Sequence, residues 1–366
     1  MAKKKVLILG KLPPPYMGPA IATEILLKSS LKNNFEIIHL NTKVNESLDG
    51  IGRWSVGKIF RSYGIYWRMI KILTARKPDL ILVPFSQGTI PFIKDAVFIA
   101  LGKIYRAKVL LHLRGSNLEN WLNKSTLFTR WFVKKMFGIT DGVIVLGNNL
   151  RYLFRNYFSP EKIFVVPNGS NYVLPVANKT GGSIVHVLYL ANLQASKGIE
   201  DVLLAVKELK LQHVEGFELS VVGLWRNVEF KNKCMLLIEE NNLPVHVFPP
   251  KSGEEKMNAL SKADIFVFTP REPEGHPWVI VEALASGLPV ISTDQGAIVE
   301  SVLDQKNGFI VNKNAPSEIA DRLKTLIRDT SLRHQMHLAS RKHYEENFTE
   351  EKMVERLTNA FNAVIG

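Results

Sequence analysis

The sequence of 366 residues contains one cysteine, Cys234. An intramolecular disulfide is excluded, and a reduced, cytoplasmic compartment is expected. No apolar run approaches the roughly 20 residues that span a bilayer. The apolar segment Val6–Leu9, which follows the first lysines, is too short for a signal peptide. No Asp-x-Asp pair occurs and the histidines are not spaced as metal ligands, so we expect no metal and no other cofactor.

Acidic residues are scarce in the first half of the chain. Residues 1–172 carry 26 Lys/Arg and 9 Asp/Glu, a net charge of +17, whereas residues 173–366 carry 21 and 25, a net charge of −4. Such a basic half attracts anionic membranes, anionic lipid carriers or nucleic acid. No nucleic-acid recognition motif is present, so we expect no nucleic-acid partner.

The basic half also carries aromatic residues interleaved with cations. They form two stretches: Trp54, Lys58, Phe60, Arg61, Tyr63, Tyr66, Trp67, Arg68 and Lys71, and then Trp121, Lys124, Phe128, Arg130, Trp131, Lys134 and Lys135. The pattern fits the headgroup zone of an anionic membrane, and equally fits amphipathic helices that bury their aromatic residues. The first alternative predicts a peripheral protein on the inner face of the cell membrane.

The pattern of short apolar runs and helical segments predicts an α/β fold with two domains, which the length also favours. Such alternation is typical of βαβ units and parallel sheets. Polar, Gly-containing residues at Pro175–Gly182 predict a linker. We expect two doubly wound, Rossmann-like domains, at 1–172 and 183–347, that face each other across a cleft. A C-terminal helix at about 348–366 should pack back on the first domain.

The predicted strands and helices follow this alternation. In the first domain, strands are expected at Lys5–Gly10, Phe35–Leu40, Asp79–Pro84, Lys108–Leu113 and Gly142–Leu146, and helices at Ala20–Lys32 and Val56–Arg76. In the second, strands are expected at Ile184–Leu190, Glu218–Gly223, His246–Phe248, Asp264–Phe268, Pro289–Ser292 and Phe309–Val311, and helices at Gly198–Lys210, Glu254–Lys262 and Pro277–Ser286. The last 50 residues should be helical.

The most informative segment is Glu274–Thr293, in which two carboxylates lie eight positions apart. Eight residues are slightly more than two helical turns, so Glu274 and Glu282 are expected to point the same way from one helix. The helix N-terminus offers unpaired N–H groups and a positive dipole to an anion. A ligand with both hydroxyls and phosphates, such as a nucleotide sugar, suits this arrangement. Glu282 as a solvated surface carboxylate is the alternative, which its apolar neighbours disfavour.

Two loops precede helices in a way that suits phosphate. In the first, strand Val6–Leu9 leads through a Pro-rich loop to Gly18 at a helix start, and a Gly there allows close approach to phosphate oxygens. A plain β-to-α connection is the alternative. In the second, Lys197 and Gly198 stand at a helix start, where the lysine adds a point charge for a diphosphate. A solvated surface lysine is the alternative.

A third candidate lies at the carboxyl end of the strand that begins at Lys108. Open α/β sheets bind ligands at this edge. His112 and Arg114 are two positions apart, so alternation sends them to the same side. Either residue could serve the site, and a structural histidine is the alternative.

Together these motifs resemble the retaining family-4 glycosyltransferases (glycosyl transferases group 1). Glu274–Thr293 is similar to their Glu, seven residues, Glu motif, and Lys197-Gly198 to their phosphate-binding Lys-Gly. Val166–Gly169 resembles the hinge motif of the family and Thr293–Glu300 its Gly-Gly-x-Pro-Glu turn. Asn307–Phe309 resembles the strand that follows. The resemblance covers about residues 160–330 in order and spacing, and the first domain more loosely.

The resemblance implies a GT-B fold whose C-terminal domain binds the donor and whose N-terminal domain binds the acceptor. Glu282 then matches the residue that binds the donor ribose, and Glu274 the one that contacts the transferred sugar. Lys197 matches the cation on the diphosphate. Backbone N–H groups at Trp278 and Val279 match donors to the sugar and phosphate.

Several positions depart from the family pattern, and three of them concern the site. Asn192 stands where an arginine usually contacts phosphate. Pro19, after Gly18, has no N–H to offer. Arg114 occupies the place of the family histidine, so either His112 or Arg114 would act beside the sugar. The implied donor-binding residues are therefore Gly18, Asn192, Lys197, Glu274, Trp278, Val279 and Glu282, and the implied catalytic residues are Glu274, His112, Arg114 and Lys197.

The implied function is that of a retaining glycosyltransferase of the hexosyltransferase class. It would move a sugar from a UDP- or GDP-linked donor to a hydroxyl of a glycan. The basic half indicates a lipid-linked or surface-polysaccharide acceptor, as in polysaccharide or lipopolysaccharide biosynthesis. The alternatives are another GT-B enzyme, namely a nucleotide-sugar epimerase or a sugar phosphorylase, and a non-catalytic nucleotide-sugar-binding protein.

Overall fold

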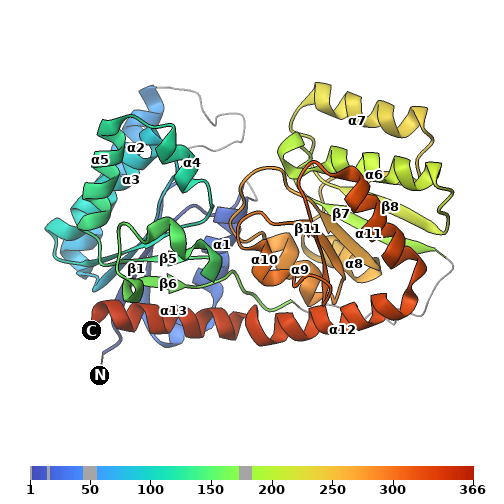
Figure 1. The fold of residues 1–366 in the computed structure, drawn as a ribbon. Helices are drawn as coiled ribbons and strands as arrows, with labels where there is room; N and C mark the ends of the chain where they lie inside the picture. The colour runs from blue at the N-terminus through green and yellow to red at the C-terminus, as the bar shows by residue number, and fades with distance from the viewer. Residues whose placement is uncertain (1, 15–16, 44–55, 173–183) are drawn as a thin grey trace. The chain divides into compact units, whose positions relative to one another are not determined.

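A computed structural model describes residues 2–14, 17–43, 56–172 and 184–366, with side chains from 63 onward in the third range (Figure 1). The predicted linker at Pro175–Gly182 and Trp54 lie outside the described residues. The chain forms two compact units. The N-terminal unit comprises Met1–Ser170 and Glu350–Gly366, and the C-terminal unit comprises Asn171–Thr349.

The N-terminal unit is built on a sheet of six parallel strands in the order β2-β1-β3-β4-β5-β6. The strands are β1 (Lys5–Gly10), β2 (Glu36–Asn41), β3 (Leu80–Pro84), β4 (Lys108–His112), β5 (Gly142–Val145) and β6 (Ile163–Val165). Strands β1 and β3 are buried along Val6–Leu9 and Leu80–Val83 because helices cover both faces of the sheet. Sequence analysis did not predict β6, whose three residues are too few for a periodic pattern.

Helices cover both faces of this sheet. They are α1 (Gly18–Lys28), α2 (Val56–Arg76), α3 (Thr89–Ile104), α4 (Leu118–Asn123), α5 (Leu127–Gly138) and α13 (Glu350–Ile365). One face carries α1 and α13, since Leu26 and Leu357 share a core with Val6 and Ile8. The C-terminal helix α13, red in Figure 1, thus packs on the N-terminal unit, and the Phe35 and Phe361 rings lie 5.4 Å apart.

The other face carries α2, α3 and α5 side by side. A Cβ on Gly102 of α3 would come within 2.8 Å of the Ile81 and Val109 side chains, so α3 lies close against the sheet. Ring contacts join α3 to its neighbours: Tyr66 of α2 lies 5.0 Å from Phe98, and Phe132 of α5 lies 6.1 Å from Phe92.

The C-terminal unit is built on a second sheet of six parallel strands, in the order β12-β11-β10-β7-β8-β9. The strands are β7 (Val185–Leu190), β8 (Phe217–Val222), β9 (Val245–Phe248), β10 (Ile265–Phe268), β11 (Val290–Thr293) and β12 (Gly308–Val311). The helices are α6 (Ile199–Leu211), α7 (Val228–Glu240), α8 (Gly253–Lys262), α9 (Trp278–Ala285), α10 (Ile298–Ser301), α11 (Pro316–Arg328) and α12 (Thr330–Asn347). The two parallel sheets with their helices confirm the predicted α/β fold class.

Two further findings concern the helices. Sequence analysis did not predict α7, which buries only Cys234 and Ile238 and so presents little apolar periodicity. Among the described residues, no helix is both long and apolar enough to span a bilayer.

Candidate functional site

The order of the strands in the C-terminal sheet marks one position for a ligand. From β7 the chain moves outward to β8 and β9, and from β10 it moves in the opposite direction to β11 and β12. Neighbouring strands β7 and β10 therefore define a topological switch point, and open α/β sheets bind ligands at the carboxyl ends of such strands. The loop after β7 contains Lys197, and the loop after β10 contains Glu274.

The turn that holds Lys197 depends on the glycine after it. A 3-10 turn at Ala195–Lys197 leads to Gly198, whose φ is +79°, and then into α6. A Cβ on Gly198 would lie 1.8 Å from the carbonyl oxygen of Thr269, which follows β10. Only glycine therefore permits this close approach of the two loops. The buried Tyr189 hydroxyl also donates to the Lys197 carbonyl at 2.8 Å.

Lys197 and Glu274 form an ion pair, although they are 77 positions apart in the chain. Their side chains are 24% and 15% exposed, so the pair is largely shielded but still partly accessible to solvent. The Lys197 ammonium also lies 6.0 Å from the centre of the Phe268 ring. An ammonium has three donors, so Lys197 retains hydrogen-bonding capacity for an anion while Glu274 orients it.

A second tight turn holds the Glu274 loop in place. Gly296, with φ +61°, lies so close that a Cβ there would come within 2.0 Å of the Glu274 carbonyl oxygen. The Ala297 N–H donates to the Gly275 carbonyl at 2.7 Å. Nε2 of the buried His276 lies 2.6 Å from the Ser301 hydroxyl. These contacts anchor the loop at Glu274 and at the two residues that follow it.

Helix α9 begins at Trp278, four residues after Glu274. The expectation that Glu274 and Glu282 project from one helix is therefore wrong. Pro277, the N-cap, has no N–H with which to extend the helix backward, and the residues before it form a loop. The first-turn N–H groups, at Trp278 and Val279, lack acceptors within the helix and form its positive end.

Glu282 lies inside the C-terminal unit, with 3% of its surface exposed. Its Oε1 accepts a hydrogen bond of 2.5 Å from the ammonium of Lys256 on α8. Its Oε2 has no hydrogen-bond partner among the described residues. Burial raises the pKa of Glu282, and the charge of Lys256 opposes that rise. The alternative of a solvated surface carboxylate is thus excluded.

The N-terminal unit brings Arg114 to the start of α1. Nη1 of Arg114 donates to the Pro19 carbonyl at 2.5 Å, directly after Gly18, where α1 begins. Its Nε and Nη2 are buried without a partner among the described residues. Burial lowers the pKa of Arg114 to about 10, which still leaves it charged at neutral pH. The guanidinium and the N-terminus of α1 are thus neighbours, as anion binding would require.

His112 is the last residue of β4 and is 5% exposed. Neither ring nitrogen has a hydrogen-bond partner among the described residues. Burial, together with the charge of Arg114, holds the pKa of His112 well below its usual range. His112 is therefore a neutral imidazole, with one N–H donor and one acceptor unused.

The comparisons with known proteins support one family. Residues 180–343 match the family described as glycosyl transferases group 1. This range covers nearly all of the C-terminal unit and includes Lys197, Glu274 and Glu282. These residues of the chain are therefore similar to the group 1 glycosyltransferases.

A curated relative of this chain is CapM of Staphylococcus aureus, named as a capsular polysaccharide biosynthesis glycosyltransferase. It is 29% identical over 69% of this chain and 70% of its own length. The matched regions span 44% to 65% of the length of the first three curated relatives.

Solved structures share the fold over almost the whole chain. A glycosyltransferase from Rickettsia africae ESF-5 has a TM-score of 0.75 at 20% identity, covering 99% of both chains. Anabaena Alr3699/HepE, solved in complex with UDP and glucose, has a TM-score of 0.73 at 16% identity, covering 98% of this chain and 99% of its own. These similarities confirm the GT-B fold.

Sequence analysis did not identify two basic residues near the candidate site, Lys256 and Arg271. Lys256 contacts Glu282 from a position 26 residues earlier, and no local motif marks it. Arg271 follows β10, and its guanidinium donates two hydrogen bonds, of 2.7 and 2.6 Å, to the carboxylate of the buried Asp201 of α6. The backbone N–H of Arg271 also donates to the Ser196 carbonyl at 3.0 Å. Arg271 therefore connects the two loops that carry Lys197 and Glu274.

Two further expectations from the sequence concern Asn192 and metal binding. Asn192 follows β7 and is exposed, and its side chain has no hydrogen bond with a described residue. Within the described part of the chain, no group of three His, Cys, Asp or Glu residues is placed to hold a metal ion.

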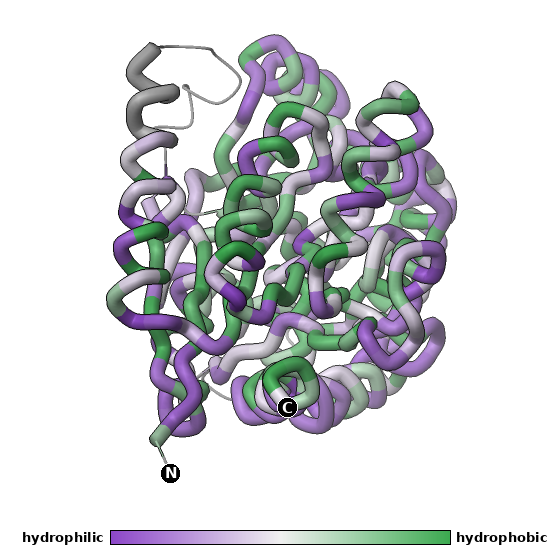
Figure 2. Tube along the Cα trace, turned by 90° about the vertical axis from the view of Figure 1, so that its left-hand side faces the viewer, coloured by the Kyte–Doolittle hydropathy of each residue, from purple (hydrophilic) through white to green (hydrophobic). Residues whose placement is uncertain are grey.

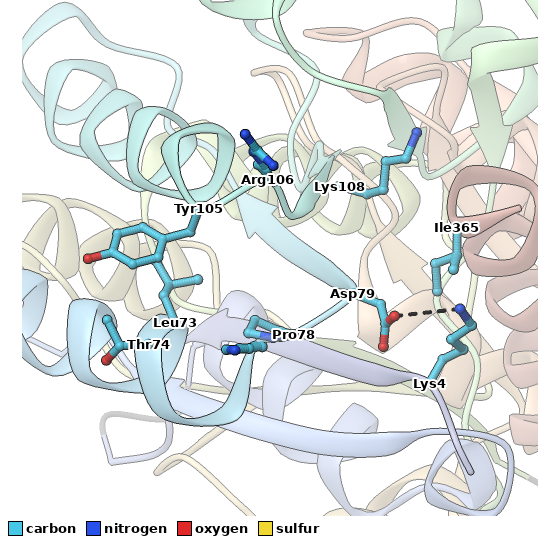
Figure 3. A pocket seen from close by; sticks show the side chains of 10 residues that line it. Lys4, Leu73, Thr74, Pro78, Asp79, Tyr105, Arg106, Lys108 and Ile365 are labelled. Atoms are coloured by element: carbon cyan, nitrogen blue, oxygen red, sulfur yellow. Dashed lines mark ion pairs between the residues drawn. The ribbon is translucent and has the colours of Figure 1, made fainter.

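A cavity of about 580 Å³ lies elsewhere in the N-terminal unit (Figure 3). It is lined by residues around the amino ends of β1, β3 and β4, including Lys4, Asp79 and Lys108. Lys4 and Asp79 form an ion pair across 3.6 Å. The cavity lies at the amino edge of this sheet, whereas His112 and Arg114 lie at its carboxyl edge, so it is not the candidate site.

Proposed function

We propose that this protein transfers a sugar, with retention of its anomeric configuration, from a nucleoside diphosphate sugar to a hydroxyl of a glycan. The observation that carries the proposal is the meeting of Lys197 and Glu274 at the switch point of the C-terminal sheet. The match of residues 180–343 to the group 1 glycosyltransferases supports it. The complex of HepE with UDP and glucose supports a UDP-linked donor as the first to test.

The donor would lie with its diphosphate between Lys197 and the N-terminus of α9. Lys197 and the N–H groups of Trp278 and Val279 would stabilise the negative charge that grows as the diphosphate leaves. Glu274 would accept hydrogen bonds from hydroxyls of the transferred sugar. Glu282 would accept one from a ribose hydroxyl through Oε2, because Lys256 already occupies Oε1.

The N-terminal unit would bind the acceptor. Gly18, at the start of α1, and the Arg114 guanidinium would both offer N–H groups to a phosphate. The neutral imidazole of His112 would offer a donor or an acceptor to a sugar hydroxyl. The acceptor hydroxyl would attack from the face that the diphosphate leaves, since Glu274 and Glu282, the carboxylates of the proposed site, would bind hydroxyls of the donor. Isolation of a covalent glycosyl adduct on Glu274 would contradict this step.

The reaction we propose uses no metal, because lysine and helix N–H groups supply the positive charge. The acceptor class we propose is a lipid-linked or surface-polysaccharide glycan at the cytoplasmic face of the membrane. Two observations support that class: the basic first half of the chain, and the name of CapM as an enzyme of capsular polysaccharide biosynthesis.

The first test is binding of UDP, GDP and ADP, free and as sugar conjugates, by calorimetry and thermal shift. We expect one nucleotide to bind, and the Lys197→Ala variant to lose most of that affinity. Lys262→Ala is the matched control, because Lys262 is an exposed lysine of the same unit. Failure of every nucleotide to bind the intact protein would refute the proposal.

The second test identifies the product. NMR of the product glycoside should show the anomeric configuration of the donor. An epimerised nucleotide sugar or a sugar phosphate as sole product would assign the protein to another GT-B activity. Donor binding with no turnover and no slow hydrolysis would assign it to non-catalytic binding.

A further inference from the structure

The outer surface of α2, α3 and α5 exposes large apolar side chains in an unusual number. Apart from Ile104, the last residue of α3, these side chains are Tyr63 (67% exposed), Trp67 (60%), Ile90 (49%), Ile93 (46%), Leu127 (81%), Phe128 (68%) and Trp131 (54%). We call these seven side chains, together with the cations named below, the aromatic-basic surface. Single exposed apolar residues are ordinary, but seven on adjoining helices mark an interaction site.

The helices of this surface adjoin one another, as the ring contacts of Phe98 with Tyr66 and of Phe92 with Phe132 require. Figure 2 views this side of the N-terminal unit and shows hydrophobic and hydrophilic segments alternating along its helices. The aromatic residues of the two basic stretches whose side chains the structure describes divide into two sets. Tyr66 and Trp121 pack inward, whereas Trp67, Phe128 and Trp131 face solvent.

The charges on these helices have one sign on their exposed side. Helices α2 and α5 contain no Asp or Glu. The one acid of α3, Asp95, is held inward by the Ser86 N–H at 2.7 Å. Among the side chains that the structure describes on these helices, the exposed cations are Arg68, Lys71, Arg76, Lys94, Arg130, Lys134 and Lys135, of which Arg76 pairs with Glu36 of β2. Lys71 lies 5.7 Å from the centre of the Trp67 ring, so cations and aromatic rings are interspersed.

We propose that the aromatic-basic surface docks the protein on an anionic lipid bilayer. Aromatic rings and leucine enter the headgroup zone while lysines and arginines contact the anionic headgroups. Charge complementarity selects the bilayer as the partner, because the surface carries exposed cations on all three helices whereas α2 and α5 contain no acid. The apolar side chains stand on the outer sides of helices, a shape that suits a broad, deformable interface.

The position of the surface relates it to the acceptor side of the N-terminal unit. Ile90, Ile93, Leu127 and Phe128 lie in the first two turns of α3 and α5. These turns follow the carboxyl ends of the strands, the edge at which His112 ends β4. Docking there brings this edge of the sheet toward the lipid, where a lipid-linked substrate would be met. The docking proposal itself does not depend on the proposed transferase activity.

The experiment measures co-sedimentation of the full chain with vesicles of phosphatidylglycerol and phosphatidylcholine, and with vesicles of phosphatidylcholine alone. We expect binding to be at least about tenfold stronger to the anionic vesicles, and to be lost at high salt. Equal binding to both kinds of vesicle, or binding that salt does not weaken, would overturn the proposal. Stronger binding to duplex DNA than to the anionic vesicles would also overturn it.

Two sets of variants locate the surface. Trp67→Ser, Phe128→Ser and Trp131→Ser combined should reduce vesicle binding at least about tenfold, as should Lys71→Glu, Lys134→Glu and Lys135→Glu combined. The matched controls lie on the C-terminal unit and should bind as the wild type does: Leu211→Ser, Leu236→Ser and Leu338→Ser, and Lys231→Glu, Lys262→Glu and Lys313→Glu. An equal loss in variants and controls would refute the location.

Unchanged thermal unfolding and unchanged nucleotide affinity of the variants show that they are folded. Because nucleotide binding is measured separately on the same proteins, the two proposals fail independently. If the protein binds nucleotide but does not bind vesicles, the transferase proposal stands and the docking proposal is refuted. A chain that binds anionic vesicles but no nucleotide gives the reverse result.

Discussion

Replacement of Lys256 by methionine should destabilise the C-terminal unit in a manner that depends on pH. The ammonium of Lys256 is the only partner of the Glu282 carboxylate in the described structure, and that carboxylate is almost wholly buried. Methionine keeps the length of the side chain but removes its charge. Removal of one partner of a buried ion pair typically costs about 3 kcal/mol or more, because the other charge remains buried and uncompensated.

The pH dependence follows from the pKa of Glu282. Burial raises this pKa, and the charge of Lys256 opposes the rise. Without Lys256 that pKa rises further. A carboxyl whose folded pKa lies above its unfolded value favours folding at low pH, and this contribution is lost as the pH rises through the folded pKa. The cost of Lys256→Met should therefore be near its full value at pH 8. It should shrink at pH 5, where Glu282 can bind a proton instead of remaining charged.

The assay is thermal unfolding of the full chain at pH 5 and pH 8. A loss of about 3 kcal/mol corresponds to a decrease in Tm of roughly 6–12 °C for a unit of this size. Lys262→Met, on the exposed part of the same helix, is the control and should leave Tm unchanged. The double variant Lys256→Met, Glu282→Gln removes both charges and should recover much of the loss.

Two results would refute this reasoning about the buried pair. One is an equal loss of Tm at both pH values, which would mean that the lost packing of the lysine chain, and not the buried charge, causes the effect. The other is a double variant no more stable than Lys256→Met alone, which would mean that Glu282 carries no uncompensated charge in the single variant.

Three further predictions concern the loops of the candidate site. Lys197→Ala should lower transfer activity by roughly 10²-fold through loss of a charged hydrogen bond, with Lys262→Ala as control, and an activity loss below threefold would contradict the proposed role. Gly198→Ala should destabilise the protein by about 3 kcal/mol, because a Cβ would lie 1.8 Å from the Thr269 oxygen. Gly253→Ala, with φ +52° and no atom within 4 Å of the Cβ, should cost only about 1 kcal/mol; equal losses in chemical denaturation would show that the contact is unimportant. Transfer should continue in excess EDTA, and a loss that Mg²⁺ or Mn²⁺ restores would require a metal in the mechanism.

Most of the fold could be predicted from local patterns. Helix α2 has the predicted bounds, Val56–Arg76, and most predicted strands agree with the structure to within one or two residues. Buried parallel strands are continuous apolar runs, and such runs are visible in the sequence without knowledge of their neighbours. Helix α7 was missed because it lies on the outside and buries only two side chains, so its apolar periodicity is weak.

The candidate site was predicted in part. Lys197-Gly198 and Glu274 belong to short motifs whose chemistry is local, and the structure brings them together. The helical argument that paired Glu274 with Glu282 was wrong, because Pro277 stops α9 at Trp278. Spacing along the sequence is a guide to direction only where the backbone is continuous helix.

By itself, the sequence determined the alternation of strands and helices, the basic charge of the first half, and the positions of the glycines at tight turns. These features depend on residue type and on near neighbours in the chain. Only the tertiary structure decided that Lys256 compensates Glu282, that Arg114 meets the start of α1, and which aromatic residues of α2 and α5 face solvent. Each of these depends on which elements pack together, and packing brings together residues that no local pattern relates.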